Sequence, residues 1–418
     1  MNTITKSKQK AALLVVGIAI FLDMLIYGLV VPILPKYASS LGASQTEIGL
    51  LFGSYAIALF IATPIFGALS DRIGRRAPML WGLLGLAAAT LLFAFAEEYW
   101  MLIVARTLQG LAAAVTWTSG LAILADLYPS KERGKAMGLA LSGQAAGILL
   151  GPTIGGWMYQ LGGYKLPFLF AAALAIADGM LRIFLLRDLP EKKSGAFLSS
   201  FGLLRNRSLL LISGVVIIGA AIPSVLEPTL PLHLQEKFNA EPGFIGMLFA
   251  IPTLSYGLAT PWIGKLSSKI GYKKAVLIGL VVVAISLPLS ALPNSMWMQA
   301  ASLVLLGLSM GMVLAPCLPA LADISEKSGL PSYGITFAIY NTAYSFGMIL
   351  GPVSSSILTD AIGLKLSYLS IGCVALLYMF IMLPSVRRTE ATRLTSNVQH
   401  DQSGCYNARA RTKGRRSL

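Results

Sequence analysis

The sequence predicts an all-α polytopic membrane protein with twelve transmembrane helices in two six-helix, pseudo-symmetric halves. Three observations support this prediction. Of the 418 residues, 56% are hydrophobic and only 12% are charged, which is about half the charged fraction of a soluble domain. Apolar runs of about 20 residues, long enough to cross a bilayer, recur along the whole chain. The second half of the chain also repeats motifs of the first half.

Twelve apolar runs qualify as membrane spans. We expect them at 11–34, 48–69, 77–95, 100–126, 135–158, 167–187, 208–232, 243–264, 274–292, 296–322, 333–358 and 365–386. The first run has a basic leader but no small-residue cleavage site, so it predicts a first span and not a signal peptide. The three cysteines predict no disulfide framework, because two of them lie inside predicted spans.

The net charge of +15 is distributed unevenly between the two sides of the predicted membrane. With the N-terminus in the cytoplasm, most Lys and Arg residues fall in cytoplasmic segments, and the outer loops hold only Lys36, Lys165, Lys237 and Lys365. This is the positive-inside pattern. It predicts a multi-pass protein of the cell (plasma) membrane with both termini cytoplasmic, and it argues against nucleic-acid binding as the reason for the basic composition.

An internal repeat divides the chain into two halves. Thr63–Arg76 returns as Thr260–Lys273, and Gly147–Pro152 returns as Gly347–Pro352. We therefore expect an N-terminal half at 1–187, a cytoplasmic linker at 188–207, a C-terminal half at 208–386 and a disordered basic tail at 387–418. Parallel halves of this kind suit rocking about a site between them near the middle of the membrane.

Two of the acidic residues inside predicted spans, one in each half, are candidates for a functional role. Asp23 lies about 18 Å into the first span at ~1.5 Å per residue, with Tyr27 one turn away on the same face. Glu227 lies in the seventh span among prolines that bend the helix. A carboxylate beside an aromatic ring attracts an ammonium group, and charge inside a membrane is usually functional. The alternatives are a hydrogen bond to a neighbouring helix for Asp23 and solvation near the outer surface for Glu227.

Two arginines also lie inside predicted spans. Arg106 is the one basic residue of the fourth span, with Gln109 one turn further on. Its structural alternative is a tether to helix-end carbonyl groups. Asp178 and Arg182 are four residues apart in the sixth span, which predicts an intrahelical ion pair.

Three motifs, in chain order, resemble those of the major facilitator superfamily and, within it, the twelve-span drug:proton antiporters. They are the loop Gly67–Arg76, the run Arg106–Gly110, and the stripe of Gly143, Gly147 and Gly151 followed by Pro152. The resemblance implies the major facilitator fold, alternating access and a proton-coupling role for Arg106. It also implies gating or structural roles for Gly67, Asp71, Arg72, Arg75, Gly143, Gly147, Gly151 and Pro152.

Shorter segments resemble the vesicular monoamine transporters. They include Leu22-Asp23, Leu226–Pro231 and Ser255-Tyr256. This resemblance implies a substrate site made of Asp23, Tyr27, Glu227, Tyr256 and Asn341, with Asp23, Glu227 and Arg106 coupled to protons. The chain departs from those transporters at Tyr55, Leu314 and Asn341, where they carry a lysine and two aspartates. The short outer loop at 36–47 favours a bacterial homologue.

The expected function is therefore proton-coupled antiport that exports cationic amines or lipophilic cationic drugs, as in multidrug efflux. We expect no enzymatic activity, no catalytic or metal site and no cofactor, because the proton gradient drives transport. The absence of a G-x-x-x-x-G-K-[ST] run argues against ATP as the energy source. The expected partners are protons, a small cationic substrate and the lipid bilayer, without nucleic acid, and the chain is expected to be a monomer. The alternatives are a proton-coupled uptake symporter for a neutral small metabolite and a channel or non-transporting receptor.

Overall fold

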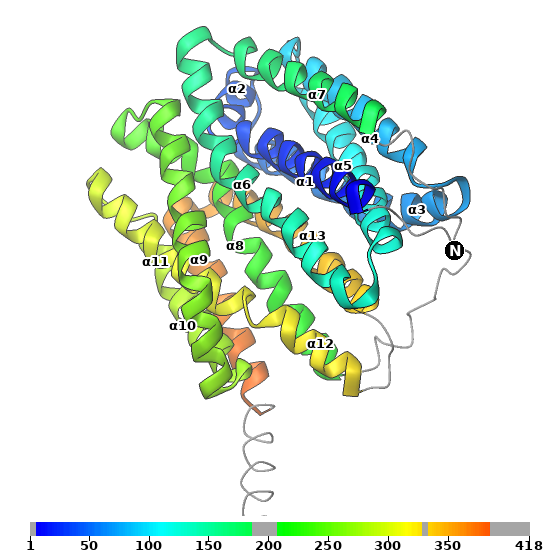
Figure 1. Cartoon of the computed structure of the whole chain (residues 1–418). Helices are drawn as coiled ribbons and strands as arrows, with labels where there is room; N and C mark the ends of the chain where they lie inside the picture. Colours follow the sequence, from blue (N-terminus) through cyan, green and yellow to red (C-terminus); the bar gives the residue numbers. More distant parts are fainter. Residues whose placement is uncertain (1–5, 186–206, 328–332, 385–418) are drawn as a thin grey trace, which may run out of the picture.

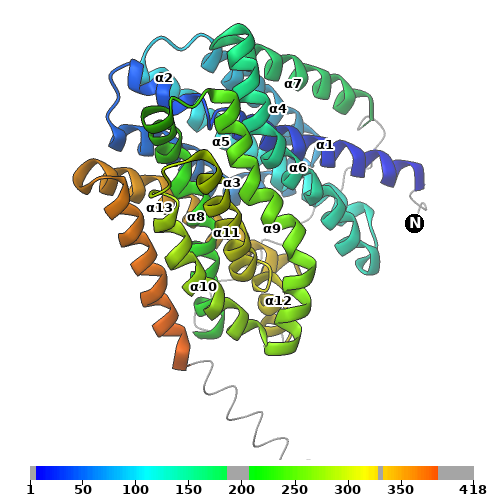
Figure 2. The ribbon, with the colours of Figure 1, turned by 90° about the vertical axis from the view of Figure 1, so that its left-hand side faces the viewer.

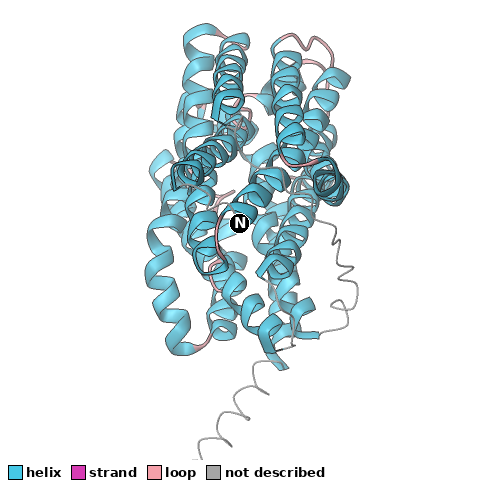
Figure 3. Cartoon of the chain, turned by 45° about the vertical axis from the view of Figure 1, so that its right-hand side comes forward, coloured by secondary structure: helices cyan, strands magenta, loops and turns pink. Residues whose placement is uncertain are grey.

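The computed structural model describes residues 6–185, 207–327 and 333–384, and every regular element in these ranges is an α-helix (Figures 1 and 3). The helices are α1 (Lys6–Leu29), α2 (Leu34–Ser40), α3 (Gln45–Ile73), α4 (Arg76–Ala94), α5 (Tyr99–Leu127), α6 (Ser130–Gly162), α7 (Lys165–Leu185), α8 (Arg207–Phe238), α9 (Pro242–Ile270), α10 (Tyr272–Leu289), α11 (Met296–Leu314), α12 (Cys317–Lys327), α13 (Tyr333–Ile362) and a last helix, Leu364–Pro384. Within these ranges, 12 helical stretches are long and apolar enough to cross a membrane. The prediction of twelve spans is confirmed.

Two predicted spans are each divided into two helices. The predicted span 11–34 ends as α1 at Leu29, and the chain turns before α2 begins at Leu34. The predicted span 296–322 comprises α11 and the start of α12, with Pro316 between them. Proline has no N–H group to donate within a helix and clashes with the preceding turn, and it stands at both breaks. The predicted linker, apart from Arg207, and the predicted tail lie outside the described residues.

The internal repeat is visible in the backbone of the turns. In the described ranges, positive φ angles occur at Gly42, Gly74, Gly163, Asn239, Gly271 and Gly363. The left-handed conformation strongly favours glycine, with asparagine the usual substitute. Gly74 and Gly271 lie at matching positions of the repeat, after α3 and after α9. Gly163 and Gly363 likewise follow α6 and α13, so both halves use the same turns at the same places.

The helices of each half pack mainly against one another. In Figure 1 the first seven helices, coloured blue to teal, lie at the upper right, and the later helices, green to orange, lie at the lower left. In the first half α1 packs on α6, and the corresponding pair in the second half is α8 on α13. The two halves meet through α6 on α9 and through α3 on α13, and Figure 2 shows α6 and α9 side by side.

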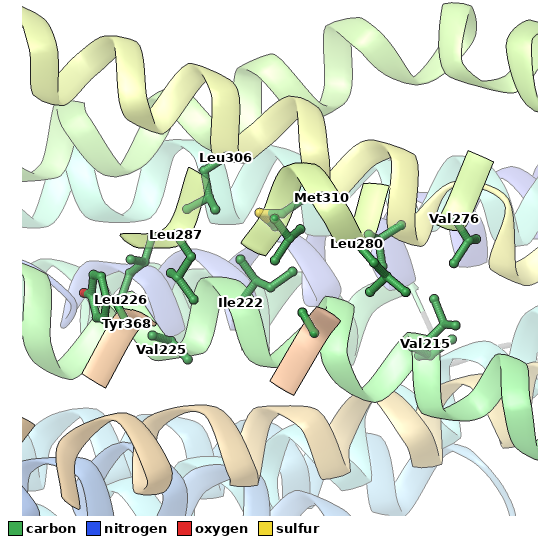
Figure 4. Packing of buried hydrophobic residues seen from close by; sticks show 14 of the residues in the cluster. Val215, Ile222, Val225, Leu226, Val276, Leu280, Leu287, Leu306, Met310 and Tyr368 are labelled. Carbon is green, nitrogen blue, oxygen red and sulfur yellow. The ribbon is translucent and has the colours of Figure 1, made fainter. Parts of the chain in front are cut away.

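Each half has its own apolar interior. Figure 4 shows part of the cluster in the second half, where residues of α8, α10, α11 and the last helix interlock. The labelled members are Val215, Ile222, Val225, Leu226, Val276, Leu280, Leu287, Leu306, Met310 and Tyr368. Large apolar side chains also lie on the outside of the helices, for example Leu161, Phe184 and Trp262. An apolar surface of this extent is unusual for a soluble monomer and is suited to contact with lipid.

Candidate functional site

Asp23 is buried in the middle of the first half. Its side chain lies on α1 and is 1% exposed. The indole Nε1 of Trp117, on α5, donates a hydrogen bond of 2.8 Å to Oδ2, whereas Oδ1 has no hydrogen-bond partner. A buried Trp N–H group usually finds an acceptor, but the acceptor could not be identified from sequence. Trp117 is therefore a site residue that the sequence analysis missed.

Glu227 is also buried, and its hydrogen bond joins the two halves. Its side chain lies on α8 and is 8% exposed. The phenol Oη of Tyr27, on α1, donates a hydrogen bond of 2.7 Å to Oε2 of Glu227. The prolines at 228 and 231 lie within α8 and do not interrupt it. Glu227 is thus in direct contact with the first half, which argues against the alternative of a residue solvated near the outer surface.

Arg106 lies close to both acids but forms an ion pair with neither. It is completely buried on α5, and its Nη1 donates a hydrogen bond of 2.7 Å to Oε1 of Gln109. Its Cζ lies 4.6 Å from the centroid of the Tyr27 ring and 5.1 Å from those of the Phe52 and Tyr55 rings. Gly110 allows this approach of α5 to α3, because a Cβ atom there would overlap the carbonyl oxygen of Tyr55.

The ion pairs of the molecule lie elsewhere. Among the residues that the structure describes, Arg75 pairs with Asp71 and Asp126, and Arg182 pairs with Asp178 at 2.5 Å. The predicted ion pair between Asp178 and Arg182 is thus present. Arg182 also donates to the backbone carbonyl of Met79, which ties α7 to α4. Asp23, Glu227 and Arg106 therefore form a group of buried charges without ion pairs.

The two remaining predicted substrate residues lie on the second half. Tyr256, on α9, packs against Gly311 of α11. Asn341 is half-buried on α13, and no hydrogen bond or ion pair joins it to Asp23 or Glu227 among the described residues. Tyr344, one turn further along α13, stacks on the ring of Tyr340.

The glycine stripe on α6 packs closely against α1. A Cβ atom at Gly143, Gly147 or Gly151 would lie 2.5–2.6 Å from a carbonyl oxygen of α1. The carbonyl groups that it would meet belong to Gly17, Phe21 and Leu25, which are spaced four residues apart like the glycines themselves. The stripe therefore fits α6 against α1, and a Cβ at Gly28 of α1 would in turn meet the ring of Pro152.

The predicted gating motif lies where α3 ends and α4 begins. Arg75 pairs with Asp71 one turn before it and, at 3.3 Å, with Asp126 near the end of α5. Asp126 was not part of the predicted motif, because its contact joins distant parts of the chain. Arg72 is exposed, and Gly67 has no heavy atom within 4 Å of a Cβ placed on it.

Polar contacts join the halves at one end of the molecule, which we name the clasp end. It is formed by the starts of α3 and α9 and the ends of α6 and α13. Thr46 donates to Asp360 at 2.7 Å, Gln45 donates to the carbonyl of Pro228 at 3.1 Å, and Gln160 donates to Glu241. Toward the other ends of α3, α6 and α9, Cβ atoms placed on Gly67, Gly134, Gly138 and Gly264 would meet no described heavy atom within 4 Å. The described polar contacts thus join the halves at the clasp end.

Sequence comparison relates the chain to amine transporters. It is 31% identical to the synaptic vesicular amine transporter of Bos taurus over 348 residues, which are 82% of this chain and 67% of that protein. It is 33% identical to the chromaffin granule amine transporter of Homo sapiens over 337 residues, which are 80% of this chain and 64% of that protein. The chain thus spans about two thirds of the length of these relatives.

Two solved structures share the fold. A bacterial homologue of the human lysosomal transporter Spinster has a TM-score of 0.79 and 15% identity, covering 91% of this chain and 98% of that one. The human organic anion transporter MFSD10 has a TM-score of 0.64 and 22% identity, covering 90% and 99%. The family model of the Major Facilitator Superfamily matches residues 16–226 and again residues 209–413. With both halves matched, and with relatives above 30% identity, the chain belongs to the major facilitator superfamily of membrane transporters.

Proposed function

We propose that the chain is a proton-coupled antiporter that exports small amine cations or lipophilic cationic drugs by alternating access. The observation that most supports this proposal is the hydrogen bond between Tyr27 and Glu227. It places a buried carboxyl of the second half against the first half, where no described residue forms an ion pair with it. The amine transporters among the relatives point to the same class of cargo.

The two acids suit exchange because each is held only by neutral donors. The Trp117 indole holds Asp23 and the Tyr27 phenol holds Glu227. A buried carboxylate without a counter-charge is costly, so it gains by binding either a proton or a cation. One carboxyl cannot bind both at once, and this competition couples the two fluxes. Protonation from one side releases the amine, and loss of the proton to the other side prepares the acid for a new amine.

The charge distribution of the sequence supports an orientation with the clasp end outside and both termini in the cytoplasm. The proposed location is the plasma membrane. The conformation described here, with the halves joined at the clasp end, is then the one that opens toward the cytoplasm. The proton gradient supplies the energy, Arg106 acts in proton coupling, and a single chain suffices because both halves of the site belong to it.

Exchange in proteoliposomes tests the proposal. Asp23→Asn and Glu227→Gln keep the size of each side chain and remove its charge, so each should abolish uptake of a labelled amine driven by an imposed pH gradient. Glu97→Gln removes an exposed carboxylate in the loop before α5 and serves as the matched control, which should retain wild-type exchange. Normal exchange by Asp23→Asn would reject the assignment.

A further inference from the structure

Arg106 has an unused hydrogen-bonding edge. Of its three nitrogens, Nη1 donates to Gln109, whereas Nε and Nη2 have no hydrogen-bond partner. The guanidinium group is a planar fork with fixed donor directions, and Nε–H and the outer Nη2–H point from the same edge. The side-chain Nε2 of Gln109 also lacks a partner. Two neighbouring residues of α5 thus present unpaired donors within the protein.

The neighbouring carboxylates do not account for this edge. Oδ2 of Asp23 accepts from Trp117 and Oε2 of Glu227 accepts from Tyr27, and neither acid lies within ion-pair distance of Arg106. The rings around Arg106 attract its charge through their faces, whereas its Nε and Nη2 have no hydrogen-bond partner among the described residues. Buried polar groups are almost always hydrogen-bonded, and a buried unpaired charge is costly. The site therefore has donor capacity that no described side chain uses.

We propose that the unpaired edge of Arg106, together with the Nε2 group of Gln109, binds a carboxylate group of the cargo. This inference rests on the proposed function, in which Asp23 and Glu227 bind the ammonium group of the same molecule. The cargo is then an amine that also carries a carboxylate, such as an amino acid or a close derivative. The site has two poles: the acceptors for the ammonium group lie on α1 and α8, and the donors for the carboxylate lie on α5.

A carboxylate fits the edge better than a single acceptor does. Two parallel N–H groups match the two oxygens of a carboxylate, and such bidentate, charge-assisted pairs are strong and directional. The two poles of the site are also close together. The Tyr27 ring lies 4.6 Å from the guanidinium carbon, and the hydroxyl of the same ring binds Glu227. One aromatic ring thus separates the donors from the acceptors, so a single small molecule can reach both.

Binding of a graded series of ligands to the purified, full-length protein tests the inference. Tyramine, tyrosinol and tyrosine share one skeleton and one ammonium group, and they carry hydrogen, a hydroxymethyl group and a carboxylate at the same carbon. A bond to a charged group is worth roughly a factor of ten or more. We expect tyrosine to bind wild-type protein at least about tenfold more tightly than tyramine, with tyrosinol closer to tyramine. Equal or weaker binding of tyrosine overturns the proposal without any variant.

Variants then locate the carboxylate. Arg106→Lys keeps the positive charge but loses the two-pronged edge, so the ratio of the tyramine to the tyrosine dissociation constant should fall toward one. Arg182→Lys alters the other buried arginine, which already pairs with Asp178, and should leave this ratio unchanged. A ratio that survives Arg106→Lys overturns the assignment. If Arg106→Lys fails to fold, Gln109→Leu replaces it, with a smaller fall of the ratio expected and an unchanged ratio counting against the proposal.

Two further arms separate the sources of failure. Added acetate should not tighten tyramine binding, and if it does so as strongly as the attached carboxylate, the edge is a site for a free anion and the proposal of a two-pole cargo is wrong. Exchange of tyramine against a pH gradient is measured in parallel. Exchange of tyramine with no preference for tyrosine refutes this inference and leaves the proposed function intact, whereas exchange of neither ligand, together with binding of neither, counts against both.

Discussion

Tyr27→Phe removes a single oxygen atom from the contact that joins the two halves at the buried acids. The ring itself stays, 4.6 Å from the Arg106 guanidinium carbon and 4.7 Å from the centroid of the Tyr55 ring. The packing is therefore preserved, and the loss is limited to the 2.7 Å hydrogen bond to Glu227. Because this bond joins α1 to α8, we expect rocking of the halves to break it.

The size of the effect follows from the chemistry of the bond. A hydrogen bond to a charged group contributes roughly 1.5–3 kcal/mol, and this one lies in a buried site. If it forms only in the conformation joined at the clasp end, its loss shifts the equilibrium away from that conformation by about ten- to a hundredfold. If the conformation joined at the clasp end dominates in the wild type, Tyr27→Phe should make its population equal to or smaller than that of the alternative conformation.

Pulsed electron–electron distance measurements give the populations. Spin labels at Gly67→Cys and Gly264→Cys report the end opposite the clasp end, because side chains at both positions have free space. They require a background in which the native cysteines at 317, 373 and 405 are replaced. Tyr27→Phe should move the distance distribution toward shorter values. The control Tyr37→Phe loses a hydrogen bond to Ala96 within the first half and should not move it. An unchanged distribution for Tyr27→Phe would refute the role of this bond as a link between conformations.

Three further predictions concern packing and gating. Gly151→Ala places a methyl group 2.6 Å from the Leu25 carbonyl oxygen. It should lower the free energy of unfolding by about 1–3 kcal/mol, which is measured as a lower melting temperature in detergent. The control Gly138→Ala has open space around the new methyl group and should leave the melting temperature unchanged or raise it. Gln45→Ala removes two hydrogen bonds between the halves, to Pro228 and Ser356, and at about 0.5–1.5 kcal/mol each should shorten the same label distances; no shift would show that the clasp is unimportant. Arg75→Ala removes the ion pairs with both Asp71 and Asp126 and should destabilise the protein more than Asp126→Asn, which leaves the contact with Asp71; equal melting temperatures would contradict the shared pairing.

The periodic and local features of the fold could be predicted from the sequence. Apolar runs gave the twelve spans, because the length of a spanning helix is fixed by the bilayer. The ion pair of Asp178 with Arg182, within one helix, also followed from residue spacing.

Contacts between helices could not be predicted in the same way. The bonds of Tyr27 to Glu227 and of Trp117 to Asp23 depend on the rotation and depth of separate helices, and helical spacing does not give these quantities. The first span is divided into α1 and α2 at a proline, but the prolines inside α8 do not end that helix. Sequence alone does not tell which proline ends a helix.

Proton release on amine binding distinguishes competition at the buried acids from independent binding of amine and proton. Purified protein in weakly buffered detergent solution is mixed with a saturating amine near neutral pH, and the change in bulk pH is recorded. If the amine and the proton compete for Asp23 and Glu227, the wild type releases protons and the double variant Asp23→Asn/Glu227→Gln releases none. Amine binding by the wild type without proton release would contradict the account.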